Sequence, residues 1–394
     1  MGSVADRVRD YVDSHALDGW GLTLIDRLIP AQFRGMKVNP LAVSGKFIAA
    51  RDATVTVVIP CYNYGRFLRD AVESATSQEG VDVQVIIVND ASPDDTATIA
   101  DELAAADHRV EVIHNEANLG HVRTFNRGLE LAKGEFLVRL DADDLLTPGC
   151  LSRAVALFDA EPSLGLVYGH PRHFTTDEPP APRTRAVTWT VWDGRDWLRE
   201  RCRRGVNCIT TPEAMLRMSV VDRLGPLDTR LRFAQDMEMW CRVATVADVG
   251  RVNGVDQALH RDHLASMSAT DGEPILVDLI ERRTVFEAVF TGTGAALSDA
   301  PALHRLARSA LSREALWRAW RVLRAGGEPE RVAELTAFVD ATDPEVLSRR
   351  DRQLLEAGLS GMRHVVRRVV LWWDGRIHSL RWAFDYVLWT RRGI

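Results

Sequence analysis

The pattern of apolar and polar residues changes near residue 54. Before it, apolar residues recur at loose helical spacing over 4–28, until Pro30 and Pro40 interrupt them. After it, short apolar runs of strand length alternate with helical stretches. The expected strands are 54–60, 83–89, 109–114, 135–140 and 164–168, and the expected helices are 66–78, 95–106, 122–132 and 148–160. This alternation predicts an α/β fold with a mainly parallel sheet.

The pattern changes again in the second half of the chain. The stretch 171–186 is rich in Pro, Thr and Arg and predicts a surface loop, which is a candidate substrate flap. After about residue 274, helical periodicity dominates. We therefore expect a helical extension at 1–50, an α/β domain at 51–274 and a helical appendage at 275–394.

Composition excludes several classes of protein. The 394 residues are 46% hydrophobic, enough for a sizeable core plus an appendage, and the net charge of -6 supplies no basic field for nucleic acid. The five cysteines are scattered and lack CxxC spacing, which predicts neither a disulfide framework nor a zinc site.

Residues 1–10 are charged where a signal peptide needs apolar residues, and no window approaches about 18 uncharged apolar residues. We expect a cytoplasmic protein that does not span a membrane.

Three carboxylates follow the expected strand at 135–140. Asp141, Asp143 and Asp144 lie within four positions, and carboxylates crowded in this way repel one another, so that a divalent cation is their expected partner. Open α/β sheets bind ligands at the carboxyl ends of their strands. The sequence therefore predicts a metal and a phosphorylated ligand at this edge.

Two neighbouring strands carry polar residues to the same edge. The first ends at Pro60-Cys-Tyr-Asn63, and the ring of Tyr62 and the amide of Asn63 can stack on and hydrogen-bond a nucleobase. The next strand is followed by Asp90, which can accept from a pyrimidine N–H, while we expect Ser92 to cap the following helix. An ordinary strand-to-helix turn is the alternative for the first segment.

A third segment lies close to an expected helix N-terminus. Asn118, Gly120, Arg123 and Asn126 combine amides with a cation, a setting that suits a diphosphate or a ribose. A plain turn explains this segment equally well when it is considered alone.

Together these segments resemble the inverting family 2 glycosyltransferases with the GT-A fold. The motifs that carry the resemblance are Pro60-Cys-Tyr-Asn63, Asn89-Asp-Ala-Ser92, Asn118-x-Gly120 with Asn126, and Leu140-Asp-Ala-Asp-Asp144. Their order and spacing match over about 54–170. The resemblance implies a nucleotide-sugar-binding half at 51–160 and an acceptor half at 161–274.

The resemblance also implies roles for single residues. Either Asp143 or Asp144 would bind Mg²⁺ or Mn²⁺ on the donor diphosphate, and Asp141 would face the sugar nucleotide. The implied nucleoside, usually uridine, would contact Tyr62, Asn63 and Asp90. The full set of implied donor-binding residues is Pro60, Tyr62, Asn63, Asp90, Asn118, Gly120, Arg123, Asp141, Asp143 and Arg261.

The acceptor half resembles the family more weakly, in segments 224–228, 234–242 and 260–268. Family members commonly carry Glu-Asp in the second segment, and that Asp is the catalytic base. Here Gln235 replaces the Glu, so that Asp236 matches the base and Glu238 is a rival. On a helix, residue 236 shares a face with 239–240 while 238 points elsewhere, which favours Asp236.

The segment His260-Arg-Asp-His263 resembles a late basic segment that closes over the diphosphate in this family. Arg261 or His263 would neutralise the departing phosphate, and His263 is also an implied metal ligand. An ordinary surface histidine is the alternative. His170 and His173 carry no signal that the sequence alone explains.

The resemblance implies metal-dependent, inverting transfer of a sugar from a nucleotide sugar, expected to be a UDP-sugar, to a hydroxyl acceptor, with Asp236 as general base. A Rossmann dehydrogenase would carry GxGxxG after its first strand and a nucleotidyltransferase a Gly-rich loop with Arg or Lys, and neither follows residue 60. A non-catalytic nucleotide-sugar-binding or scaffold protein stays open. Its support is the apolar helical face at 372–389, which also predicts a homo-oligomer or a peripheral membrane contact.

Overall fold

The computed structural model describes residues 37–39, 52–186, 188–263, 275–324 and 328–348. Within the full chain, residues 37–307 form one compact unit, and residues from 308 onward belong to a second. Most of the expected N-terminal extension, and the whole apolar face at 372–389, lie outside the described residues.

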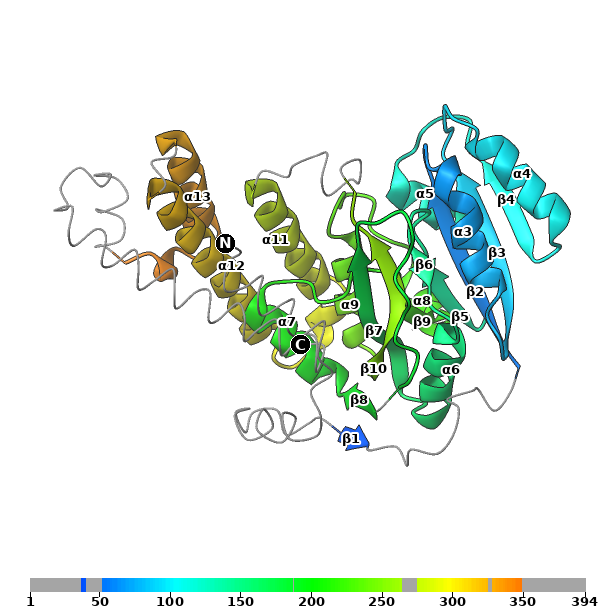
Figure 1. Cartoon of the computed structure of the whole chain (residues 1–394). Coiled ribbons are helices and arrows are strands. Elements are labelled where there is room, and N and C mark those ends of the chain that lie inside the picture. Colours follow the sequence, from blue (N-terminus) through cyan, green and yellow to red (C-terminus); the bar gives the residue numbers. More distant parts are fainter. Residues whose placement is uncertain (1–36, 40–51, 187, 264–274, 325–327, 349–394) are drawn as a thin grey trace. The chain divides into compact units, whose positions relative to one another are not determined.

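The larger unit is built on a ten-stranded mixed sheet (Figure 1). Its strands are β1 (Lys37–Asn39), β2 (Ala53–Cys61), β3 (Val81–Asn89), β4 (Val110–His114), β5 (Phe136–Arg139), β6 (Leu145–Leu146), β7 (Leu164–Phe174), β8 (Thr188–Trp192), β9 (Met215–Arg217) and β10 (Asp248–Arg261). The order across the sheet is β1-β8-β10-β7-β9-β5-β2-β3-β4, and β6 pairs with β10. The expected α/β class is confirmed.

The half that contains β2 to β5 is parallel, as the sequence predicts. Its helices are α3 (Gly65–Thr76), α4 (Thr96–Ala106), α5 (His121–Leu129) and α6 (Cys150–Ala160). Residues of α3, α4 and α6 share a core with Val57 of β2, whereas Gly128 of α5 packs against Val58, which points to the other face. Because both faces are covered, these strands are continuous apolar runs, which is why periodicity locates them well.

The other half of the sheet is mixed. The short strand β9 runs antiparallel to both β5 and β7 and joins the two halves, while β10 runs parallel to β7 and antiparallel to β8. The sequence predicts a loop from residue 171, but β7 continues to Phe174, because Pro171 and the residues after it pair with β10. The loop therefore begins at residue 175.

This loop is tied to β10 by a buried carboxylate. Asp256 accepts from the backbone N–H of Arg183 at 2.8 Å and forms an ion pair with its guanidinium at 2.5 Å. The ring of His170 lies 3.2 Å from the same carboxylate. The candidate flap therefore has a fixed point at Arg183.

The helices after β8 include those that the sequence predicts beyond residue 274. They are α7 (Gly194–Arg204), α8 (Met218–Leu224), α9 (Gln235–Ala244), α11 (Ile275–Thr291), α12 (Ala300–Arg324) and α13 (Pro329–Thr342), with short 3₁₀ turns at Thr293–Ala296 and Pro344–Val346. The larger unit extends beyond the expected boundary at 274, because α11 packs against α9. In the second unit, Arg308 donates to the carbonyl oxygen of Thr342 at 2.6 Å. Among the described residues, no helix has the length and apolar character that a membrane crossing requires.

Candidate active site

The loops after β2 and β3 are joined by a hydroxyl group. The N–H of Asn63, a residue in the left-handed region, donates to Ser92 Oγ at 3.0 Å. The expected cap is therefore wrong: α4 starts at Thr96, and the carboxylate of Asp94 accepts from the N–H of Thr96 at 3.2 Å. The ring of Tyr62 is 47% exposed beside this junction and is accessible to a planar ligand.

Asp90 organises the loop that leads into α5. Its carboxylate is buried and accepts from the N–H groups of Leu119 at 2.8 Å and Gly120 at 2.9 Å, and from Asn115 Nδ2 at 2.7 Å. Asn118 Oδ1 also accepts from the N–H of Gly120, at 3.0 Å. The second and third motifs thus meet through Asp90, while its contact with a nucleobase stays a prediction.

The remaining donor-side motif residues differ in exposure. Pro60 is buried within β2, and Arg123 is exposed on α5. Asn126 donates from Nδ2 to the carbonyl oxygen of Leu227 at 2.9 Å and accepts from its N–H at 3.0 Å. Asn126 therefore attaches α5 to the segment 224–228, a contact that the motif alone did not predict.

Two carboxylates of the acidic motif have separate histidine partners near the end of β10. Asp143 Oδ2 lies 2.9 Å from His263 Nε2. Asp144 is fully buried, with Oδ2 2.9 Å from His260 Nδ1 and Oδ1 accepting from the N–H of Arg261 at 2.8 Å. Both oxygens of Asp144 are thus engaged, whereas Asp143 pairs with His263 through Oδ2 and is only partly buried.

The electrostatics of this motif reflect burial and crowding. Burial raises the pKa of Asp143, and the negative charge of Asp141 raises it further. Burial raises the pKa of Asp144 to about 7, although its hydrogen bond with His260 opposes the change. Burial would lower the pKa of His260, but Asp144 outweighs it and raises that pKa to about 9. Crowded carboxylates in this setting favour a nearby cation.

Arg261 supports the acidic motif from within the protein. Its guanidinium carbon lies 4.6 Å from the ring centroid of Phe67 and 4.5 Å from that of Phe174, and its Nε donates to the carbonyl oxygen of Asp143 at 3.1 Å. The side chain is buried in this position. A contact between Arg261 and a phosphate stays a prediction.

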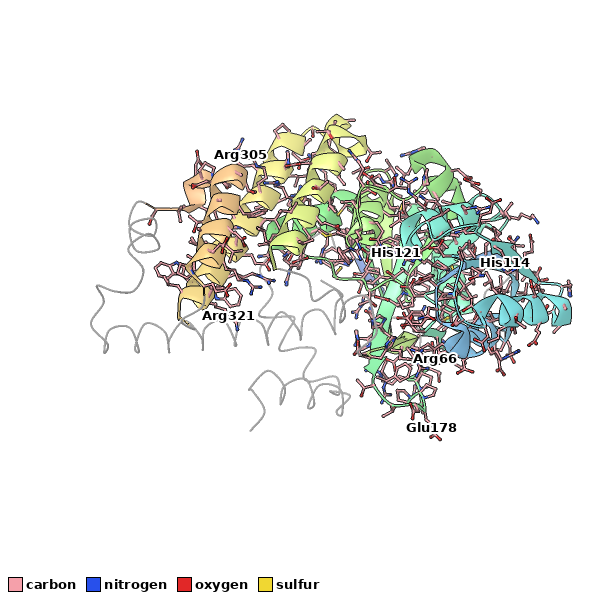
Figure 2. All side chains as sticks on the ribbon, turned by 90° about the horizontal axis from the view of Figure 1, so that it is seen from above. Arg66, His114, His121, Glu178, Arg305 and Arg321 are labelled. Atoms are coloured by element: carbon pink, nitrogen blue, oxygen red, sulfur yellow. The ribbon has the colours of Figure 1, made fainter. Side chains whose placement is uncertain are left out.

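Arg139 connects the acidic motif to α9. It donates from Nε and Nη2 to Asp141 Oδ1 at 3.0 and 2.8 Å. In the amide orientation that satisfies both of its ends, Gln235 accepts from Arg139 Nη1 at 3.1 Å and His121 Nε2 at 3.2 Å, and it donates to the carbonyl oxygens of 232–233. A carboxylate could not make those two donations, which explains why an amide fits here. His121 (labelled in Figure 2) has its pKa lowered to about 4 by burial and by the charge of Arg139.

The two rival base candidates have different environments. Asp236 accepts from Asn207 Nδ2 at 2.8 Å and from the N–H of Met237 at 2.7 Å, and burial raises its pKa to about 6. Glu238 is buried in an ion pair with Arg242, at 2.7 Å. The carboxylate of Glu238 is therefore occupied by a structural partner.

One residue that the sequence does not indicate contacts the segment just before α9. Glu281 of α11 accepts from the three consecutive backbone N–H groups of 232–234, at 2.9, 2.7 and 2.8 Å. These groups precede the helix that carries Asp236, so Glu281 holds the start of that helix. No motif surrounds Glu281, so a sequence gives no signal for it.

Residues 56–225 match the family model of glycosyl transferase family 2. The glycosyltransferase GlyG of Streptococcus pneumoniae is 32% identical over 119 residues, which are 29% of this chain and 40% of GlyG. The chain thus spans less than half the length of that relative.

Solved structures share the fold. S. aureus TarS (1–349) in complex with UDP-GlcNAc superposes with a TM-score of 0.53 at 15% identity, covering 74% of this chain and 82% of TarS. The mannosyltransferase PcManGT from Pyrobaculum calidifontis, in complex with GDP-Man and Mn²⁺, gives a TM-score of 0.50 at 18% identity and covers 98% and 99% of the two chains. The expected GT-A fold is confirmed.

We predict that Glu281→Ala lowers the free energy of unfolding by about 2 kcal/mol, because three N–H groups lose their charged acceptor. Urea unfolding followed by circular dichroism measures the change. Glu287→Ala is the matched control, since that carboxylate lies on the same helix and is half exposed. Equal stabilities of the two variants would contradict the role of Glu281.

Proposed function

We propose that this chain is a metal-dependent, inverting glycosyltransferase, because residues 56–225 match the family model of glycosyl transferase family 2. It transfers a sugar from a nucleotide sugar to a hydroxyl acceptor. The observation that carries the proposal is the bridge made by Arg139, which hydrogen-bonds both Asp141 of the acidic motif and Gln235, the residue before Asp236. The bridge sets the donor-side carboxylates and the candidate base in one fixed arrangement.

A UDP-sugar is the proposed donor. The exposed side chain of Tyr62 offers a stacking surface, and Asp90 Oδ2, which accepts one hydrogen bond from the N–H of Gly120, has a second lone pair for a pyrimidine N–H. The similar structures differ in their nucleotide, since the TarS structure contains UDP-GlcNAc and the PcManGT structure contains GDP-Man. The preference of this chain for one nucleobase therefore has to be measured.

The acidic motif has the donor atoms that a divalent cation needs. Asp143 supplies a partly buried carboxylate, and His263 supplies an imidazole 2.9 Å from it. Carboxylate oxygens suit Mg²⁺ and Mn²⁺. We assign Asp143 as the main ligand, because both oxygens of Asp144 already have partners. A bound ion would stabilise the charge of the departing diphosphate as a Lewis acid.

Asp236 is the proposed general base. Its carboxylate removes the proton of the acceptor hydroxyl while the new bond to the anomeric carbon forms, on the face opposite the departing diphosphate. One displacement from one face inverts the anomeric configuration. Asn207 fixes the orientation of the carboxylate through its hydrogen bond. A pKa of about 6 leaves Asp236 ionised at neutral pH and still basic enough to accept a proton.

Removal of the metal tests the donor site. We expect EDTA or Asp143→Ala to abolish most donor hydrolysis, measured without acceptor, and to weaken UDP binding in calorimetry. Asp101→Ala is the matched control, because Asp101 forms a similar carboxylate–histidine pair with His114, at 3.0 Å on the surface. Full turnover in metal-free buffer would refute the metal dependence, and an absence of hydrolysis in every buffer would favour the scaffold alternative.

Replacement of the two acids separates the base from its rival. Asp236→Asn should lower kcat by about 10² to 10⁴ while the affinity for the donor and the fold are retained. Glu238→Gln should instead lower the free energy of unfolding by about 2 kcal/mol, because Arg242 loses its ionised partner. If Glu238→Gln abolished turnover and Asp236→Asn were nearly silent, the base would have to be reassigned.

The pH profile tests the same assignment. Because the base must be ionised, kcat should fall as the pH drops through about 6, the pKa of Asp236. Burial and the charge of Asp141 raise this pKa, whereas Arg139 and Asn207 lower it. Asn207→Ala should therefore move the inflection to higher pH. An unmoved inflection in that variant would show that another group controls the profile.

A further inference from the structure

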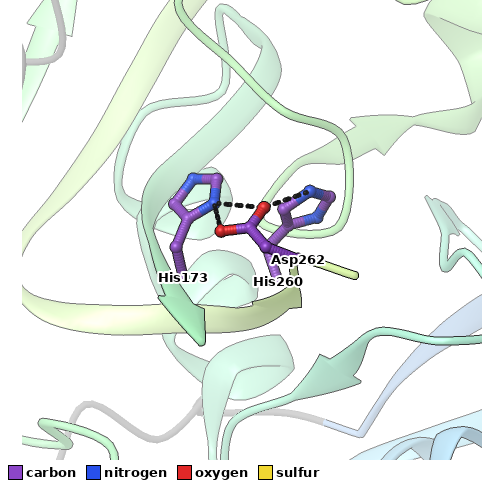
Figure 3. A group of neighbouring side chains, drawn as sticks. All are labelled: His173, His260 and Asp262. Atoms are coloured by element: carbon purple, nitrogen blue, oxygen red, sulfur yellow. Dashed lines mark hydrogen bonds and ion pairs between the residues drawn. The ribbon is translucent and has the colours of Figure 1, made fainter. Parts of the chain in front are cut away.

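A second group of side chains lies at the carboxyl ends of β7 and β10: His173, His260 and Asp262 (Figure 3). His173 and His260 are register partners in the parallel ladder, and the N–H of Asp262 donates to the carbonyl oxygen of Phe174 at 2.8 Å. Residues 260 and 262 lie on the same side of an extended chain. The register of the two strands thus brings two imidazoles and one carboxylate together.

The distances within the group are close to those of a metal site. The carboxylate of Asp262 lies 3.2 Å from His173 Nδ1 and 3.8 Å from His260 Nε2, and the three potential ligand atoms lie within 4.8 Å of one another. Tetrahedral sites with bonds of about 2.0–2.2 Å hold their ligand atoms about 3.3–3.6 Å apart. A small rotation of the side chains would bring all three atoms to one ion.

The second nitrogen of His260 has the partner that a metal-binding histidine requires. His260 Nδ1 lies 2.9 Å from Asp144 Oδ2. In metal sites, a carboxylate that accepts from the far ring N–H fixes the tautomer and directs the other nitrogen to the ion.

We propose that His173, His260 and Asp262 form a site for a borderline divalent transition metal such as Zn²⁺, separate from the ion on the donor diphosphate. Two imidazoles and one carboxylate suit such a metal better than Mg²⁺, and three protein ligands leave a fourth position for water. The bound ion ties the end of β7 to the end of β10 and holds His260 against Asp144. The site uses none of the side chains assigned as donor-metal ligands.

The experiment measures metal binding by the metal-stripped full chain, in the absence of nucleotide sugar. An Asp143→Ala background removes the main ligand of the donor site, so that uptake there does not mask the second site. Calorimetry with Zn²⁺ should give one equivalent, and Co²⁺ should give visible absorption bands of low coordination number. His173→Ala and Asp262→Asn should each lower the affinity for Zn²⁺ by about 100-fold. His108→Ala is the matched control and should leave the affinity unchanged, because this exposed histidine lies 3.9 Å from the carboxylate of Asp107, away from the proposed site.

Two results would overturn the proposal. One is the absence of Zn²⁺ uptake by the Asp143→Ala protein, and the other is uptake that both His173→Ala and Asp262→Asn leave unaltered. Circular dichroism establishes that each variant is folded, and Asp262→Asn, which preserves the shape of the side chain, keeps the test valid if His173→Ala unfolds. Because neither readout involves sugar transfer, failure here leaves the proposed glycosyltransferase activity untouched.

Discussion

Crowding of negative charge at the end of β5 is the constraint on which the candidate site depends. Asp141, Asp143 and Asp144 lie within four positions, and repulsion between such groups grows as water is excluded. Arg139 of the same strand hydrogen-bonds the carboxylate of Asp141, and histidines at and just beyond the end of β10 pair with the other two carboxylates. The last strand in the sequence, β10, must therefore reach the end of β5, which brings the mixed half of the sheet onto its parallel half.

The parallel half of the fold was predictable because its strands are buried on both faces. Continuous apolar runs in β2 and β3 leave a clear signal, and the polar residues directly after them are contiguous in the sequence. The mixed half was not predictable on that basis. Strand β9 has three residues, too few for a periodic pattern, and β7 continues through Pro171, which reads as a loop residue until its pairing with β10 is seen.

The same distinction holds for the candidate site. The sequence indicates Asp90 and Asp236 as candidates because their neighbours form a pattern. The surroundings of His173 and Glu281, in contrast, depend on strand register and helix packing. The contact of Ser92 with Asn63 was missed because Ser92 also has the appearance of a helix cap. Gln235 departs from the family pattern, and its partners explain the change: an amide accepts from two side chains and donates to two carbonyl groups.

The attachment of α9 to Glu281 has a consequence for how this domain can be recombined. A chimaera that joined residues up to 274 to a foreign C-terminal segment would keep every motif of the family, yet it would leave the three N–H groups of 232–234 without their acceptor. The smallest portable unit is therefore set by a carboxylate outside the motifs. A replacement C-terminal segment must therefore carry an acidic side chain at the position of Glu281.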